Sequence, residues 1–228
     1  MKRILSLMLA LAMVIGLTAC TSTTQPKYKT AEEIQSAVQE QLASTSKTLS
    51  AEFDKFQKKI GPSFDDYTTN AGAVDDWYTF ILNQSRALHE TLFESTIACY
   101  HLIADAGIKD YKTWNSSMDD CYKMWDRAMD DYYDTWDDLV SDTYDLLDDI
   151  ITMAYDTEEY RTVSDAWSDM YEKYSDAWSA LYELHSDTWS DLYENHSDVW
   201  SGFYSGNNHV DELISHTAPR DSADSQGK

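Results

Sequence analysis

Residues 164–207 read SDAWSDMYEKY SDAWSALYELH SDTWSDLYENH SDVWSGFYSGN, four copies of one eleven-residue unit. Each copy has a Trp, an apolar residue three positions later and a Tyr four positions later, and these offsets lie on one face of an α-helix. Eleven residues at about 100° each exceed three turns by only about 20°, so successive tryptophans lie nearly above one another. The pattern predicts a helix that buries this stripe and leaves its acidic positions in solvent. The predicted inward rings are Trp167, Trp178, Trp189 and Trp200 with Tyr171, Tyr182, Tyr193 and Tyr204.

The same unit occurs in a more divergent form from residue 114 onward. Its Trp position is held by Trp114, Trp125, Trp136 and Leu147. Pairs of aspartates fall between the apolar positions, and we expect them to face outward as a solvated surface; they are Asp119-Asp120, Asp130-Asp131, Asp137-Asp138 and Asp148-Asp149. The segment that holds this divergent repeat is therefore predicted to form a second acidic, amphipathic helix.

The junction between the two repeats leaves two alternatives open. Leu147 and Trp167 are twenty residues apart, so an uninterrupted helix would place the two stripes about 200° apart. This offset favours a hairpin. However, residues 157–163 contain no Gly or Pro, and a single very long helix is the alternative.

Two earlier segments also have helical periodicity. Thr30 and Glu33 form a capping-box pattern ahead of a first apolar stripe, and Gly107 is a typical residue for the end of a second helix. The expected fold class is all-α, an elongated bundle of three or four long antiparallel helices with hendecad repeats. The expected helices are about 31–60, 73–106, 111–156 and 163–206 within a helical domain at 30–216. A flexible tether at 20–29 precedes the domain, and a disordered tail at 217–228 follows it.

The N-terminal twenty residues, MKRILSLMLALAMVIGLTAC, have a basic start, an apolar run and small residues at the end. This is the pattern of a secretory signal peptide, here residues 1–19. The ending Leu17-Thr18-Ala19-Cys20 resembles the lipobox of bacterial lipoproteins. The resemblance covers these twenty residues only. It implies that Cys20 carries a lipid that includes palmitate, and that this lipid attaches the chain to a membrane.

The charge balance limits the classes of partner. The chain has 17 Lys and Arg against 41 Asp and Glu, a formal net charge of −24, and removal of Lys2 and Arg3 with the signal takes it to −26. Because so negative a chain repels the phosphates of nucleic acids, we expect no nucleic-acid partner. Weak, diffuse binding of divalent cations to the aspartates is expected, but no spacing predicts a specific metal site.

No motif of an enzyme, a cofactor site or a metal site stands out, so we predict no catalytic, cofactor-binding or metal-binding residues. His185 and His196, one unit apart, are expected to lie at the edge of the core rather than to share a metal. Cys99 and Cys121 are equidistant from Asp110, the expected N-cap after the turn at Gly107. They are therefore predicted to face each other and are candidates for a disulfide in an oxidising compartment.

These observations predict a non-enzymatic, lipid-anchored helical protein outside the cytoplasm. It would act as a binding or spacing module at the bacterial cell surface, on the cell membrane or the outer membrane, with a partner that the sequence does not identify. The alternative is that the aromatic helices bind lipid or another apolar ligand. In its period alone, the repeat resembles the eleven-residue repeats of apolipoproteins and perilipins, whose helices lie on lipid. Those helices have Lys or Arg beside the apolar face, whereas this chain has Asp there.

Overall fold

The structure is a computed structural model that describes residues 28–220. The predicted signal peptide, Cys20, most of the tether and the end of the predicted tail lie outside the described residues. Within the described range, no helix is both long enough and apolar enough to cross a membrane.

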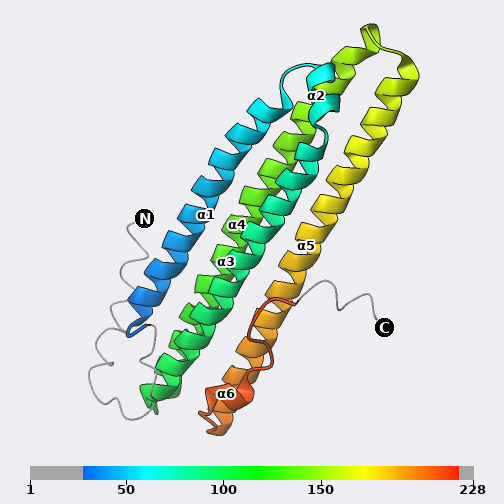
Figure 1. Cartoon of the computed structure of the whole chain (residues 1–228). Helices are drawn as coiled ribbons and strands as arrows, with labels where there is room; N and C mark the ends of the chain where they lie inside the picture. The colour runs from blue at the N-terminus through cyan, green and yellow to red at the C-terminus, as the bar shows by residue number, and fades with distance from the viewer. Residues whose placement is uncertain (1–27, 221–228) are drawn as a thin grey trace. The chain divides into compact units, whose positions relative to one another are not determined.

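Helices are the only regular secondary structure in residues 28–220 (Figure 1). They are α1 (Ala31–Ile60), α2 (Phe64–Asn70), α3 (Gly72–Asp105), α4 (Tyr111–Met153), α5 (Tyr160–Ser205) and α6 (Val210–Leu213), with a 3₁₀ turn, η2 (Ala154–Asp156), after α4. The predicted all-α class is therefore confirmed.

Local side-chain chemistry determines where these helices begin and end. The Thr30 hydroxyl accepts a hydrogen bond from the Glu33 backbone N–H at 3.2 Å and caps α1. The Asp110 carboxylate likewise accepts from the Thr113 N–H at 2.9 Å at the start of α4. Gly107 ends the helix before it with a φ of 57°, a left-handed conformation that glycine adopts without steric cost.

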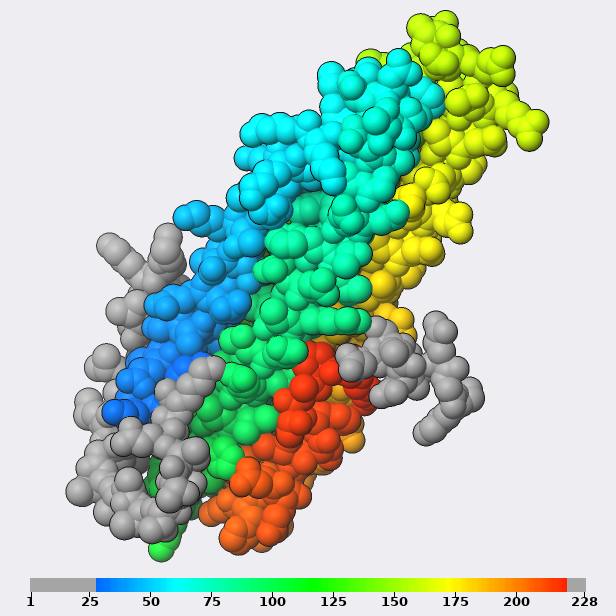
Figure 2. Space-filling view, in the orientation of Figure 1, coloured from blue at the N-terminus to red at the C-terminus, as the bar shows by residue number. Residues whose placement is uncertain are grey.

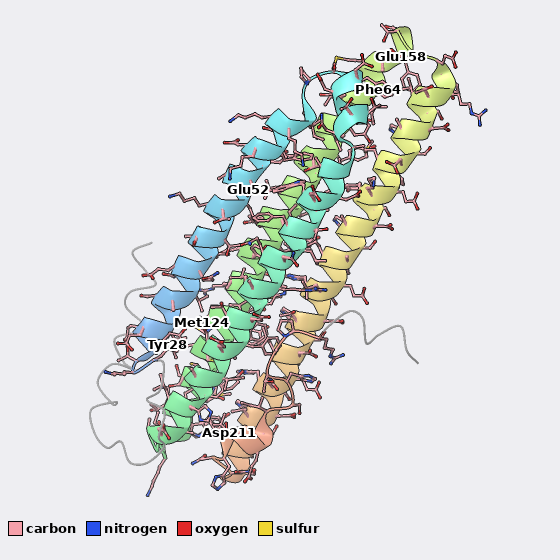
Figure 3. All side chains as sticks on the ribbon, in the orientation of Figure 1. Tyr28, Glu52, Phe64, Met124, Glu158 and Asp211 are labelled. Carbon is pink, nitrogen blue, oxygen red and sulfur yellow. The ribbon has the colours of Figure 1, made fainter. Side chains whose placement is uncertain are left out.

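The chain turns between the two repeats. Helix α4 ends at Met153, the η2 turn follows, and α5 begins at Tyr160. The Glu158 N–H donates to the Ala154 carbonyl at 2.9 Å, and the labelled Glu158 marks this turn in Figure 3. We expected the turn within residues 157–163. Because α4 ends at Met153, the break begins three residues before that range.

The described residues divide into two compact units. Unit 1 holds residues 28–42, 89–129 and 187–220, and unit 2 holds residues 43–88 and 130–186. Helices α1, α3, α4 and α5 each contribute one part to unit 1 and another to unit 2.

The apolar stripes of the first two long helices form the core as their periodicity predicts. The fully or almost fully buried side chains of these stripes are Ile34, Val38, Leu49, Phe56 and Ile60 of α1 and Val74, Trp77, Ile81, Leu88, Leu92, Cys99 and Ile103 of α3. In unit 1, the α1 and α3 side chains of this core pack with Trp114, Met118 and Trp125 of α4 and with Leu192 and Val199 of α5; they are Ile34, Val38, Leu92, Cys99 and Ile103. Burial of this apolar surface is the main stabilising contribution to both units.

The two repeats differ in which positions they bury. In α4 the Trp position is buried, with Trp125 0% and Trp136 1% exposed, and so are the residues four positions later. In α5 the residues three positions after the first three tryptophans, Met170, Leu181 and Leu192, are buried, while the tryptophans are half-buried. The prediction that the tyrosines of α5 point inward is wrong, because they are among the most exposed rings in the structure. At about 100° per residue, the core side of α5 is turned by roughly 70° relative to that of α4.

Candidate functional site

Each half-buried tryptophan of α5 donates its indole N–H to a polar side chain of α4. Trp167 and Trp178 of unit 2 donate to Asp148 and Asp137 at 2.9 Å each. In unit 1, Trp189 donates to Asp126 at 3.0 Å and Trp200 to Asn115 at 2.9 Å. The residue number rises by eleven in α5 as it falls by eleven in α4, so the two helices run antiparallel in each unit. We call these four pairs the indole ladder.

The indole ladder corrects our expectation for part of the acidic surface. We expected Asp137 and Asp148 to face solvent only, but both accept hydrogen bonds from indole groups. A partly buried indole N–H needs an acceptor, and a carboxylate supplies a strong one. The sequence does contain a signal for this arrangement, because each α4 acceptor directly follows a Trp-position residue. Grouping Asp137 and Asp148 with their neighbours as solvated pairs does not reveal that spacing.

Each α5 tryptophan also stacks on the tyrosine four residues later. The four ring pairs have centroid separations of 5.4, 5.0, 5.2 and 5.3 Å and interplanar angles of 12°, 9°, 6° and 7°. The outer faces of the tyrosines remain open: Tyr171, Tyr182, Tyr193 and Tyr204 are 48%, 46%, 49% and 66% exposed. We call these four residues the tyrosine row. Stacking on a hydrogen-bonded indole holds each ring in a defined orientation.

Tyrosines of α4 lie beside the tyrosine row and are close to carboxylates. In unit 2, Tyr144 contacts Tyr174 with ring centroids 4.9 Å apart, and Tyr174 in turn lies 6.3 Å from Tyr171 of the row. Burial and then the charge of Asp148 raise the pKa of Tyr144, and burial and then Asp137 raise the pKa of Tyr133. In unit 1, Tyr122 lies 6.5 Å from Tyr193 in an edge-to-face arrangement. Aromatic rings and carboxylates are therefore interleaved on this side of each unit.

An aromatic pocket of about 540 Å³ lies in unit 1 beside the last tyrosine of the row. Its wall includes Tyr111, Trp114, Phe203 and Tyr204, with Lys109 among the lining residues. Trp114 packs against Trp200 and Phe203 at centroid distances of 5.8 and 6.3 Å. The volume is in the range of small-molecule sites.

The histidines of the repeat lie at the edge of the core. His196 contacts Tyr122 at 5.4 Å between ring centroids, and its Nδ1 is 3.3 Å from the Tyr100 hydroxyl. Burial lowers the pKa of His196 to about 4, against an opposing effect of Asp119. Burial also lowers the pKa of His185, which packs on Tyr133 at 5.1 Å. Both are therefore neutral at physiological pH.

The two internal cysteines lie close together in the core of unit 1. Cys99 and Cys121 are both buried as free thiols, and Cys121 interacts with Cys99 and with the Thr96 carbonyl, 3.9 Å from its sulfur. Burial, then this thiol contact, raises the pKa of Cys121. The facing arrangement argued from the sequence is present, and the disulfide between the two residues stays a prediction.

A C-terminal segment, residues 214–220, lies on the surface of unit 1 and is here called the strap (Figure 2). The side chain of buried Asn195 in α5 holds the strap. Its Oδ1 accepts hydrogen bonds from the backbone N–H groups of Ser215 and His216 at 3.0 Å each, and its Nδ2 donates to the backbone carbonyl of His216 at 2.6 Å. The preceding α6 approaches α5 closely at Gly202, where an added Cβ would lie 2.4 Å from Leu213.

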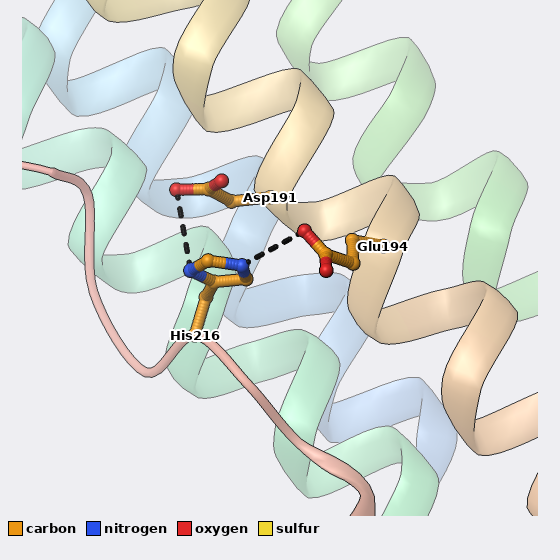
Figure 4. A group of neighbouring side chains, drawn as sticks. All are labelled: Asp191, Glu194 and His216. Carbon is orange, nitrogen blue, oxygen red and sulfur yellow. Dashed lines mark hydrogen bonds and ion pairs between the residues drawn. The ribbon is translucent and has the colours of Figure 1, made fainter.

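The strap closes over two acidic residues of α5 (Figure 4). His216 Nε2 is 3.0 Å from a Glu194 oxygen, and His216 Nδ1 is 3.7 Å from Asp191 Oδ2. Arg220 forms an ion pair with the other oxygen of Asp191. Our expectation that Asp191 is a solvated position is wrong, because its side chain is 0% exposed. Burial raises its pKa, and the nearby His216 and Arg220 oppose that effect.

Comparison of the chain with models of protein families, with curated proteins and with solved structures gives no match.

Proposed function

We propose that the chain is a bacterial lipoprotein, held by a lipid on Cys20 to the outside of the cell membrane or to the outer membrane. Its helical domain serves as a non-enzymatic binding or spacing module. The support for export and anchoring is the signal-peptide and lipobox pattern of residues 1–20. We also propose that the domain is an elongated bundle of three or four antiparallel helices with hendecad repeats.

The observation that carries the binding function is the tyrosine row. Four rings with about half of their surface exposed are held in fixed orientation by stacked tryptophans. An ordered aromatic face loses little conformational entropy when a partner binds it. Two such faces in each unit are more than α5 needs for packing, because its core positions are filled by other residues.

Charge complementarity indicates the chemistry of the partner. The formal net charge of −24 and the carboxylates beside the tyrosines attract cations, and tyrosine faces bind ammonium and guanidinium groups. We therefore propose that the partner is a polypeptide with exposed Arg and Lys side chains.

Binding of poly-L-arginine to the purified full chain tests this function, with poly-L-glutamate as the negative control. The double variant Tyr182→Leu, Tyr193→Leu keeps apolar area and removes two π faces, and should weaken binding by about 5- to 30-fold on the cation–π scale of roughly 0.5–1 kcal/mol per exposed ring. Tyr160→Leu is the matched control, since Tyr160 is 74% exposed and precedes the repeats. Equal binding by both variants would mean that charge alone attracts the probe.

The anchor is tested separately. Cys20→Ser should release the protein into the aqueous fraction or leave it unprocessed. Unchanged partitioning into detergent with an unchanged processed mass would exclude lipidation.

The second candidate function, binding of lipid or another apolar ligand, is favoured by the aromatic pocket at Trp114 and Phe203. Neutral phosphatidylcholine vesicles distinguish the two functions. A large increase in helicity and a blue shift of Trp emission on adding vesicles would support the lipid function, and unchanged spectra together with poly-L-arginine binding would support the first.

A further inference from the structure

Asp191, Glu194 and His216 form a group that neither the predicted sites nor the proposed function uses. Asp191 and Glu194 are three residues apart and share one face of α5. His216 comes from the strap, so two separate segments of unit 1 contribute to the group. One oxygen of each carboxylate and one imidazole nitrogen lie within 4.8 Å of one another.

The buried carboxylate of Asp191 has capacity for a further partner. Its Oδ1 is paired with Arg220, but its Oδ2 is buried and has no hydrogen bond, because His216 Nδ1 is 3.7 Å away. A buried carboxylate oxygen without a hydrogen bond is costly, and cation coordination removes that cost. This oxygen is directed at the imidazole (Figure 4).

The backbone that carries the imidazole is held in place independently of the acidic residues. Asn195, 1% exposed, makes three hydrogen bonds with the backbone of Ser215 and His216. Close packing of Leu213 against Gly202 further restricts the start of the strap. Glu194, with its side chain 54% exposed, is free to turn toward a cation without disturbing the core.

We propose that Asp191, Glu194 and His216 bind one Zn²⁺ ion and so tie the strap to α5. Zinc takes carboxylate oxygen and imidazole nitrogen at about 2.0–2.2 Å, commonly with three protein ligands and a water. Ca²⁺ and Mg²⁺ prefer oxygen ligands alone, so the histidine selects against them. This site differs from the weak, diffuse cation binding expected of the exposed aspartates.

Isothermal titration of the metal-free full chain with ZnCl₂ tests the proposal, in excess MgCl₂ to occupy the diffuse acidic surface. One Zn²⁺ should bind per chain. His216→Ala and Glu194→Gln should each weaken binding at least about tenfold, whereas His209→Ala, an exposed histidine outside the group, should not. Circular dichroism of each variant checks that the helices are retained, and the visible spectrum of the Co²⁺ form should change in Glu194→Gln.

Two outcomes would overturn the proposal. One is the absence of a saturable zinc isotherm in excess Mg²⁺. The other is a zinc isotherm that both His216→Ala and Glu194→Gln leave unchanged, which would place the zinc elsewhere on the acidic surface. Neither result bears on the tyrosine row, so this inference and the proposed function fail independently.

Discussion

Helices α4 and α5 repeat the same eleven-residue spacing but use it differently. In α4 the Trp position points into the core, as with Trp125 and Trp136, and charged residues cover the remaining surface. In α5 the equivalent ring lies at the edge, donates its N–H across the seam and supports an exposed tyrosine. The comparison teaches that a repeat period sets the spacing of rings, whereas the rotation of the helix decides whether they stabilise the fold or present a surface.

The largest expected effect comes from removing one ring of each kind in unit 1. Trp125→Ala should lower the free energy of unfolding by about 3–5 kcal/mol, because it empties a fully buried site. Trp189→Ala should cost about half as much, since that ring is half-buried. Chemical denaturation of both variants measures the difference. Equal losses would show that the two helices do not differ in the way described.

The second effect separates two aspartates at the same position of the α5 repeat. Asp191→Ala removes a buried carboxylate paired with Arg220 and should cost about 1.5–3 kcal/mol. Asp169→Ala removes its exposed counterpart in unit 2 and should change stability by less than about 0.5 kcal/mol. Thermal melts of the pair would contradict this interpretation if the two shifts were alike.

The third effect depends on pH and on His196. Burial lowers the pKa of this residue in the folded chain to about 4, whereas in the unfolded chain it is near 6.5. Protonation therefore favours unfolding: the stability from neutral His196 is complete above pH 6.5 and falls as the pH decreases toward 4. Tyr100, Tyr122 and Asp119 face the ring, and the pKa of about 4 already includes the opposing effect of the negative Asp119. From the difference between the folded and unfolded pKa values, we expect a loss of about 2 kcal/mol at pH 5.

The variant His196→Asn isolates this contribution from all other titrating groups. Its free energy of unfolding should change less between pH 7.5 and pH 5 than that of the unmodified chain. Parallel pH profiles for the two proteins would assign the acid sensitivity to other residues.

The smallest expected effect concerns the indole ladder. Asp137→Ala leaves the indole N–H of Trp178 without its acceptor and should cost about 0.5–1 kcal/mol, because the site is partly open to water. Asp138→Ala, one residue on and exposed, should be neutral. Guanidinium titration with Trp fluorescence as the probe reports both stability and the environment of the indole. If Asp137→Ala left the free energy of unfolding unchanged, the hydrogen bonds of the indole ladder would not contribute to stability.

The sequence predicts the helices and most of the core because each stripe of α1 and α3 follows one period with clear caps. Val74, Ile81 and Leu92 are buried as their spacing requires. The rotation of α5 was not predictable in this way, since Trp and Tyr at offsets of zero and four lie on one face whether or not that face is the core. What decides it is the packing of Leu181, Leu192 and their neighbours against other helices.

The group at Asp191 was missed for a different reason. Its partners Arg220 and His216 lie 29 and 25 positions further along the chain. Arg220 falls in the predicted disordered tail at 217–228, and His216 is the last residue of the predicted helical domain. No local pattern indicates that Asn195 captures the strap. By contrast, the facing of Cys99 and Cys121 follows from their equal distances to one turn, which the sequence does specify.

The regular step of the indole ladder creates a degeneracy during folding. If α5 slipped by eleven residues along α4, one of the two tryptophans in each unit would still meet an acceptor of the same unit, so the wrong register would keep half of these bonds. The short connection between Met153 and Tyr160 removes most of that choice, because it leaves no slack for a slipped alignment. Lengthening this loop by eleven residues should therefore produce two interconverting registers rather than a simple loss of stability.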